Sequence, residues 1–217
     1  MSLPRHNWLH WLVLAGGVLL LVCSVMADDA ASIIAKLQKK YDAIHDASVD
    51  FTETVKFGVT QSEQDFSGRF MMKRGNKYRI ELEQETIVTD GTTVWSYSKI
   101  NKQVLIDKYK KDPKSFSPEN VLVNVPENYY ATLLDNGQGE GGKTYDIKLV
   151  PKDGKSNIKW IKVWVDQDEL LMRKIQSLDV SDNLTTYTIK GIRLNLSLDD
   201  ASFQFQAPNN VEVIDLR

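Results

Sequence analysis

Polar and apolar residues alternate along most of the chain after residue 48, with the period of two that is typical of half-buried β-strands. In "NKYRIELEQ", Tyr78, Ile80 and Leu82 fall on one side of a strand and charged residues on the other. "TDGTT" contains an Asp-Gly pair, which favours a tight hairpin turn. We therefore expect an antiparallel sheet of about ten or eleven strands. The expected strands cover residues 49–57, 66–72, 78–82, 86–89, 94–97, 104–106, 145–150, 158–165, 170–178 and 184–194, with a last short one near Phe203 and Phe205.

Two regions break this alternation and predict helices. Between Asp28 and about Ala47, apolar residues recur at steps of three and four, which indicates one amphipathic helix. Its apolar face is formed by Ile33, Ile34, Leu37, Tyr41 and Ile44. Farther along, Ser117 precedes a proline in "SPENVLVNV", and Pro126 opens "PENYYATLLDN". A proline in the first turn is typical of a helix start, so these two apolar segments predict two short helices.

Some of the predicted strands are apolar on both faces. "IKWIKVWV" places Trp160 and Trp164 on one face and Ile161 and Val163 on the other, and Trp95 lies opposite a valine. A single antiparallel sheet needs only one dry face. The pattern is compatible with a closed barrel packed against helices or with two stacked sheets. It is equally compatible with a strongly curved sheet whose concave face lines a cavity closed by the apolar helices.

The N-terminal segment has the features of a secretory signal peptide. Arg5 precedes the uncharged, apolar run 12–26, and small residues precede the expected cleavage after Ala27. Two alternatives remain. The run 8–26 approaches the length of a membrane anchor, and Cys23 could be a lipidated N-terminus, although a valine stands where such sites have a small residue. We expect cleavage, which leaves residues 28–217 as one domain.

Composition excludes several classes of protein. The only cysteine lies in the predicted signal peptide, and His45 is the only histidine after residue 27. A zinc cluster and a thiol nucleophile are therefore excluded, and any Ser-His-acid triad would need His45, which lies near the end of the first helix. Carboxylates are plentiful, but no pair stands out as catalytic. The net charge of −2 offers no basic stripe for nucleic acid. We expect a protein that is not an enzyme and uses no cofactor or metal.

Four segments resemble the periplasmic outer-membrane lipoprotein carriers, the LolA family. "FMMKRGNKYRIEL" resembles the family's Lys-Arg-Pro-Asn-x-aromatic-Arg segment, and "IVTDGTTVWSYS" resembles its Val-x-Asp-Gly-x-x-x-Trp-x-Tyr segment. "FQFQAPNNVEVIDL" is similar to its closing strand and tail. "VDFTETV" is similar to its Phe-x-Gln strand, with Glu53 near the usual glutamine. The segments follow in the family's order and cover the chain after residue 27 in outline.

The resemblance implies a strongly curved, incomplete antiparallel β-barrel with a helical lid. Such carriers act in the periplasm, take triacylated lipoproteins from an inner-membrane ABC transporter and deliver them to an outer-membrane receptor. The resemblance further implies a monomer that holds acyl chains in the hollow of the barrel and breaks no covalent bond. The residues expected to line this acyl-chain cavity are Phe51, Phe70, Met72, Tyr78, Ile80, Leu82, Trp95, Leu122, Tyr130, Leu133, Leu134, Trp160 and Trp164.

Arg74 matches the family arginine that links barrel and lid in the closed form, so the resemblance implies that it is a lid latch. Gly75 replaces the proline that usually follows, which loosens the turn. The plainer interpretation is that Arg74 is a surface charge at a hairpin. Two alternative functions also remain: a module of the same fold that senses envelope lipid or lipoprotein, and a glycolipid carrier.

Overall fold

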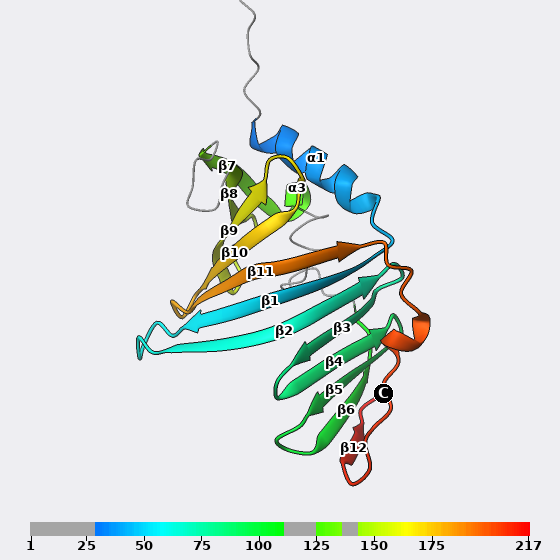
Figure 1. Ribbon diagram of the computed structural model, residues 1–217. Coiled ribbons are helices and arrows are strands. Elements are labelled where there is room, and N and C mark those ends of the chain that lie inside the picture. Colours follow the sequence, from blue (N-terminus) through cyan, green and yellow to red (C-terminus); the bar gives the residue numbers. More distant parts are fainter. Residues whose placement is uncertain (1–28, 111–124, 136–142) are drawn as a thin grey trace, which may run out of the picture.

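The computed structural model describes residues 29–110, 125–135 and 143–217 (Figure 1). They form one sheet of twelve strands. These strands are β1 (Asp46–Lys56), β2 (Glu63–Lys73), β3 (Lys77–Leu82), β4 (Glu85–Asp90), β5 (Thr93–Ser98), β6 (Gln103–Lys108), β7 (Tyr129–Asp135), β8 (Thr144–Pro151), β9 (Ile158–Asp166), β10 (Met172–Asp179), β11 (Leu184–Leu194) and β12 (Glu212–Asp215). Their order in the sheet is β12-β6-β5-β4-β3-β2-β1-β11-β10-β9-β8-β7, and only the β12–β6 pair is parallel.

The sheet is strongly curved and does not close, because its end strands β12 and β7 each pair with a single neighbour in the described part of the chain (Figure 1). This confirms the predicted incomplete antiparallel barrel and rules out a closed barrel and two stacked sheets. The predicted strands from residue 49 to 106 and from 145 to 194 are present with small shifts at their ends. The predicted signal peptide, 1–27, lies outside the described residues. None of the helices in the described ranges is both long and apolar enough to cross a bilayer.

Helix α1 (Ala30–Asp42) begins where the sequence predicts it. The Asp29 side chain caps the helix by accepting a hydrogen bond of 2.7 Å from the backbone N–H of Ser32. Lys39 and Lys40 lie in the last turn, where cations interact favourably with the helix dipole. The helix is shorter than predicted. It ends at residue 42 because β1 starts only four positions later and takes the following residues into the sheet.

The mid-chain prediction was wrong for its second helix. Only Val125–Asn128 (α3) is helical, and the "YYATLLD" that follows is the edge strand β7, paired antiparallel with β8. The alternation of Tyr129, Ala131 and Leu133 on one face fits a strand, and pairing with β8 satisfies the backbone that a short helix would have paired internally. The first predicted helix falls on residues 117–124, outside the described residues.

The C-terminal strand was also misplaced. Residues near Phe203 form a short 3-10 helix, η1 (Asp200–Phe203), and the strand follows later, as β12. Phe203 is fully buried, and η1 lies against β3 and β4. The ring of Phe205 lies 5.6 Å from that of Tyr97 on β5. The segment therefore works as a cover that packs on the sheet through aromatic side chains.

The main core lies between α1 and one face of β7–β10, which we call the α1 face. Residues paired across an antiparallel sheet point to the same side, so the register extends this face across the other strands. The fully or nearly fully buried members of this core are Ile33, Ile34, Leu37, Ile147, Leu149, Ile161, Val163, Val165 and Met172. The second face is called the opposite face, and it is the one that the C-terminal segment covers over β3 and β4.

Candidate functional site

The α1 face continues past the main core onto β1, β2 and β3, where apolar side chains are only half-buried. Across these strands Phe51 stands beside Gly68 and Leu82, Phe70 beside Ile80, and Met72 beside Tyr78. These residues have intermediate exposure, in contrast to the core under α1. We call the six side chains the open apolar half; they are Phe51, Phe70, Met72, Tyr78, Ile80 and Leu82.

Aromatic rings connect this surface to its surroundings. The ring centroids of Phe70 and Tyr78 are 6.5 Å apart, and Tyr78 has an edge contact with Tyr109 at the same distance. Phe51 meets Tyr187 of β11 edge to face at 6.0 Å. Such geometries are the preferred ones for aromatic pairs. The surface is therefore an ordered aromatic and aliphatic layer across four strands.

Gly68 allows this layer to pack closely. A Cβ atom at this position would lie 2.7 Å from Cδ2 of Leu82, 2.8 Å from the Glu81 carbonyl oxygen and 2.9 Å from Cζ of Phe51. Only glycine therefore lets the Phe51 ring rest against the backbone of β2. The structure therefore shows close packing at this glycine.

One polar pair lies within the α1 face. Glu53 accepts a hydrogen bond of 3.0 Å from the Tyr187 hydroxyl. Burial, with the nearby Glu53 charge as a second cause, raises the pKa of Tyr187. In the sequence, Glu53 stands out only as a family position. Its phase with Phe51 along β1 could have placed it on this face, whereas its partner could not be known before the register.

Arg74 joins the β2–β3 turn to the end of α1. Its Nε donates to the Ile44 carbonyl at 3.2 Å, its guanidinium donates to the Asp42 carbonyl, and its backbone N–H donates to the His45 carbonyl at 3.1 Å. Carbonyls at a helix C-terminus lack intrahelical partners, so a cation there satisfies them. The guanidinium is thus placed to hold α1 to the hairpin.

Gly75 gives the turn a shape that the family's proline could not adopt. Its φ is +90°, and the following Asn76 also has a positive φ of 60°. Proline is restricted to a φ near −65°. The replacement of proline by glycine therefore changes the backbone after Arg74, while Arg74 still reaches the end of α1.

The structure separates the other predicted cavity residues from the open apolar half. Trp160 and Trp164 alternate with Ile161 and Val163 and point to the opposite face. Trp95 also lies there, paired with Val88 and Ile106. The sequence could not assign these faces because both faces of the strands are apolar.

The predicted residues of β7 fall in different places as well. Leu133 packs against the core under α1. Tyr130 and Leu134 are exposed, by 64% and 49%. Leu122 lies outside the described residues. Among the described residues, no group of three or more His, Cys, Asp and Glu side chains could hold a metal ion.

The protein is thus a curved open sheet with a helix on one face and a half-exposed apolar layer beside that helix. Residues 42–206 match the family described as "Outer membrane lipoprotein carrier protein LolA". The chain belongs to this family, which confirms the resemblance seen in the sequence.

Named relatives support this assignment, and a solved structure shares the fold. The chain is 30% identical over 192 residues to an "Outer-membrane lipoprotein carrier protein" of Haemophilus influenzae, covering 87% of this chain and 88% of the relative. It is 28% identical over 195 residues to the protein of the same name from Haemophilus ducreyi, covering 85% of each. A crystal structure of an uncharacterized conserved protein from Thermus thermophilus shares the fold, with a TM-score of 0.58, 10% identity and coverage of 86% and 98%.

Proposed function

We propose that this protein is a periplasmic carrier of triacylated lipoproteins. It binds their acyl chains on the open apolar half, receives them from an inner-membrane ABC transporter and delivers them to the outer membrane. The names of the family and of its relatives support this proposal. The observation that carries it is the gathering of six half-buried apolar side chains on the face that bears α1.

The half-exposed character of this surface suits a carrier. Each buried methylene contributes about 0.8 kcal/mol, so one long acyl chain contributes roughly 10 kcal/mol. Full burial of three chains would approach or exceed the limit of roughly 18–21 kcal/mol for noncovalent binding, and cargo would not leave. Partial burial on a surface that is already half-covered keeps binding reversible.

Arg74 acts as the latch in this proposal. A hydrogen bond from a charged donor is worth about 1.5–3 kcal/mol, which is large enough to bias a two-state equilibrium and small enough to be broken. The bonds to the Asp42 and Ile44 carbonyls hold α1 against the hairpin. Movement of α1 away from the sheet would break them and extend the exposed apolar surface from the open apolar half onto the core that α1 covers.

Acyl-chain binding is tested with two adjacent positions on β1. Phe51→Asp places a charge in the open apolar half, whereas Thr52→Asp places the same charge on the opposite face. Lipid that co-purifies with each variant is identified by mass spectrometry. We expect loss of lipoprotein or other acylated lipid with Phe51→Asp and retention with Thr52→Asp. Equal retention by both folded variants would contradict the binding surface.

The latch is tested by scoring loading and delivery separately with purified membranes. Arg74→Leu should load from the inner membrane but deliver poorly, because closure no longer helps to expel the chains. Arg74→Lys should restore delivery only in part, since lysine lacks the planar fork of donors. The control is Arg69→Leu, on β2 five residues before Arg74 and paired with Asp50 on the opposite face. Normal delivery by Arg74→Leu would return Arg74 to the role of a surface charge.

Mass spectrometry of the mature N-terminus separates a free carrier from a tethered sensing module. A chain that starts at Asp28 supports the carrier. A retained N-terminal segment favours the sensing module. The lipid class in the co-purification experiment separates a lipoprotein carrier from a glycolipid carrier.

A further inference from the structure

Two tryptophans and three lysines form an ordered patch on the opposite face of β8–β10. The open apolar half lies on the other side of the sheet. Within this Trp–Lys patch, Lys162 and Lys174 place their ammonium groups 4.3 and 4.8 Å from the ring centroid of Trp164. Lys148 lies 5.9 Å from the ring of Trp160. Trp164 is thus contacted by two cations, each at a distance typical of a cation–π interaction.

The register makes the patch continuous. Lys148 stands directly beside Lys162, and these two lysines lie in the row between the two indoles. Lys174 stands beside Trp164 in the neighbouring row. Both tryptophans are half-buried. Lys148, Lys162 and Lys174 are likewise half-buried, as is common where lysine stems pack on aromatic rings.

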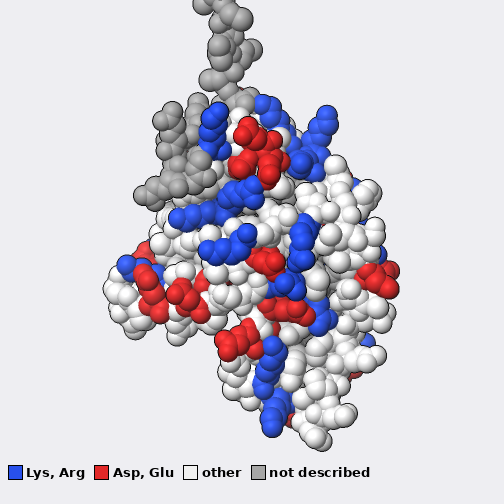
Figure 2. Space-filling model, viewed as in Figure 1, with Lys and Arg blue, Asp and Glu red and all other residues white. Residues whose placement is uncertain are grey.

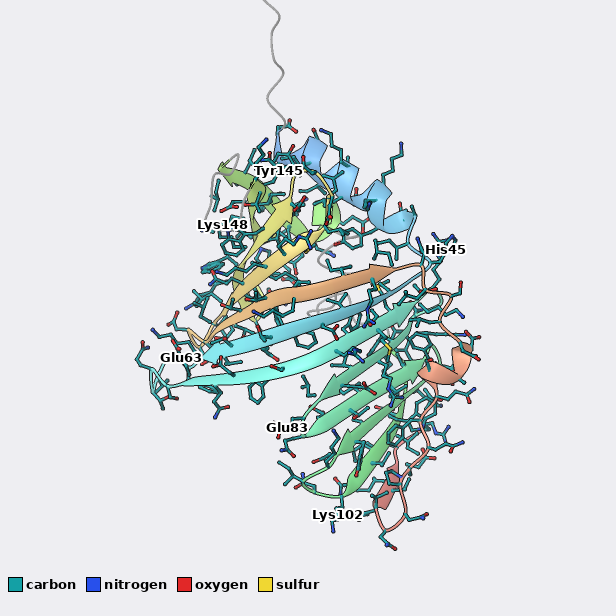
Figure 3. All side chains as sticks on the ribbon, in the orientation of Figure 1. His45, Glu63, Glu83, Lys102, Tyr145 and Lys148 are labelled. Carbon is teal, nitrogen blue, oxygen red and sulfur yellow. The ribbon has the colours of Figure 1, made fainter. Side chains whose placement is uncertain are left out.

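The patch carries an excess of positive charge. Asp146 lies 3.4 Å from the Lys162 ammonium group, but its side chain is only 13% exposed. Among the described residues, Lys148 and Lys174 have no carboxylate within salt-bridge distance. Basic side chains gather over the β8–β10 region in Figure 2. Figure 3 labels Lys148 in the same region. The whole chain, by contrast, has a net charge of −2.

Neighbouring residues extend the patch with an apolar rim. Tyr130 and Val150 stand side by side on β7 and β8, with 64% and 39% of their surface exposed. The Lys152 ammonium group lies 5.3 Å from the Tyr130 ring. The combination of indole, phenol and lysine resembles in composition the belts by which proteins contact lipid headgroups.

We propose that the Trp–Lys patch docks this protein on the surface of an anionic phospholipid membrane. The ammonium groups would bind headgroup phosphates, and the tryptophan and tyrosine rings would lie at the level of the headgroups. Charge complementarity selects this occupant, because three lysines oppose one largely covered carboxylate. Docking through the opposite face leaves the α1 face free, so the protein can bind a membrane and carry cargo at the same time.

Co-sedimentation with lipid vesicles tests this docking. The probes are vesicles of phosphatidylcholine alone and of phosphatidylcholine with phosphatidylglycerol. We expect the purified protein to sediment with the anionic vesicles and not with the neutral ones. Salt of about 1 M, where the Debye length is about 3 Å, should abolish the binding. Failure to bind anionic vesicles, or equal binding to both compositions, would overturn the proposal and leave an acidic protein surface as the partner to test.

A matched pair of triple variants locates the binding. Lys148→Gln, Lys162→Gln and Lys174→Gln together should weaken binding to anionic vesicles at least about tenfold, because each basic residue contributes separately. Lys102→Gln, Lys108→Gln and Lys110→Gln remove the same charge from exposed positions in and around β6 and should leave binding unchanged. Equal weakening by both triple variants would show a general charge effect and overturn the patch.

Two further readouts keep the result separate from cargo binding and from misfolding. Phe51→Asp, which removes the proposed acyl-chain binding, should sediment with anionic vesicles as the unchanged protein does. Thermal melts should show both triple variants folded.

Trp164→Phe should reduce the blue shift of tryptophan emission on vesicle addition. An undiminished shift would mean that Trp164 does not enter the headgroup region and would overturn its part in the docking.

Discussion

The two halves of the α1 face are made of similar side chains but have different burial. Under α1, Ile147 and Ile161 are fully buried and belong to a continuous core. On β1–β3, Phe70 and Ile80 occupy the same face and remain half-exposed. Burial of apolar area is worth about 25 cal/mol per Å², so the covered half is where this face contributes most to folding. The open half leaves its apolar area only partly buried, which the proposed binding of acyl chains requires.

The same face of one sheet thus carries a covered core and a half-exposed apolar surface. Helix α1 contributes Ile33, Ile34 and Leu37 to the covered half and leaves the other half uncovered. Arg74 connects the two, because it lies on the open side and bonds to the end of α1. A shift of α1 would therefore break the Arg74 hydrogen bonds and expose the covered half beside the open one.

The largest expected effect comes from two adjacent leucines of β7. Leu133→Asp places a charge against the core under α1, whereas Leu134 is 49% exposed. An unpaired charge in an apolar core is among the costliest substitutions, so we expect Leu133→Asp to lower the free energy of unfolding by more than about 3 kcal/mol. Leu134→Asp should change it by less than about 1 kcal/mol. Urea denaturation measures both, and equal losses would contradict the assigned faces of β7.

A second pair compares the halves directly. Ile161→Ala opens a cavity in the covered half and should lower the free energy of unfolding by about 2–5 kcal/mol. Ile80→Ala removes the same atoms from the open half and should cost about 1 kcal/mol, because its side chain is already part-solvated. Urea midpoints at unchanged slope give both values. A larger loss for Ile80→Ala would mean that the open half is a second core and not a partly exposed surface.

Gly68→Ala tests the packing within the open half. The new methyl group would collide with the Glu81 carbonyl oxygen and with the Phe51 ring, and the backbone atom cannot move out of the way cheaply. We expect a loss of about 1–3 kcal/mol, which is typical of overpacking. Near-ultraviolet circular dichroism should report the displaced aromatic rings. The control is Gly154→Ala, at an exposed position where a Cβ atom would meet nothing within 4 Å.

The smallest expected effect concerns pH and the C-terminal cover. Hydrogen bonds from Lys73 and Lys77 hold the pKa of Asp200 at about 2, below its ordinary value of 3.8. Because the folded value is lower, this carboxylate stabilises the protein above pH 4, and the contribution disappears between about pH 4 and 2. Asp200→Asn should remove this small dependence, since the ion pairs are exposed and screened by salt. Carboxyl NMR titration checks it, and a midpoint near 3.8 would contradict the ion pairs.

The sequence by itself determined the strands, the amphipathic helix and the family. Period-two alternation marked β1–β6 and β8–β11 because successive side chains of a strand point to opposite faces of the sheet, and the Asp-Gly pair fixed the turn before β5. Phe51, Phe70 and Ile80 could be assigned to one apolar surface for the same reason. Local chemistry was sufficient there, since alternation is a property of neighbouring residues.

Only the tertiary structure decided what depends on pairing. The segment "YYATLLD" is typical of a helix after Pro126. It forms β7 instead, because it pairs with the edge of β8. Trp160 and Trp164 are as apolar as Ile161 and Val163, and only the side on which α1 packs separates the core from the Trp–Lys patch. Arg74 finds its acceptors about thirty residues away, at carbonyls that no pattern of side chains reveals. The physical reason is common to all three: side-chain periodicity gives the two faces of an element, but only long-range contacts choose what lies on each of them.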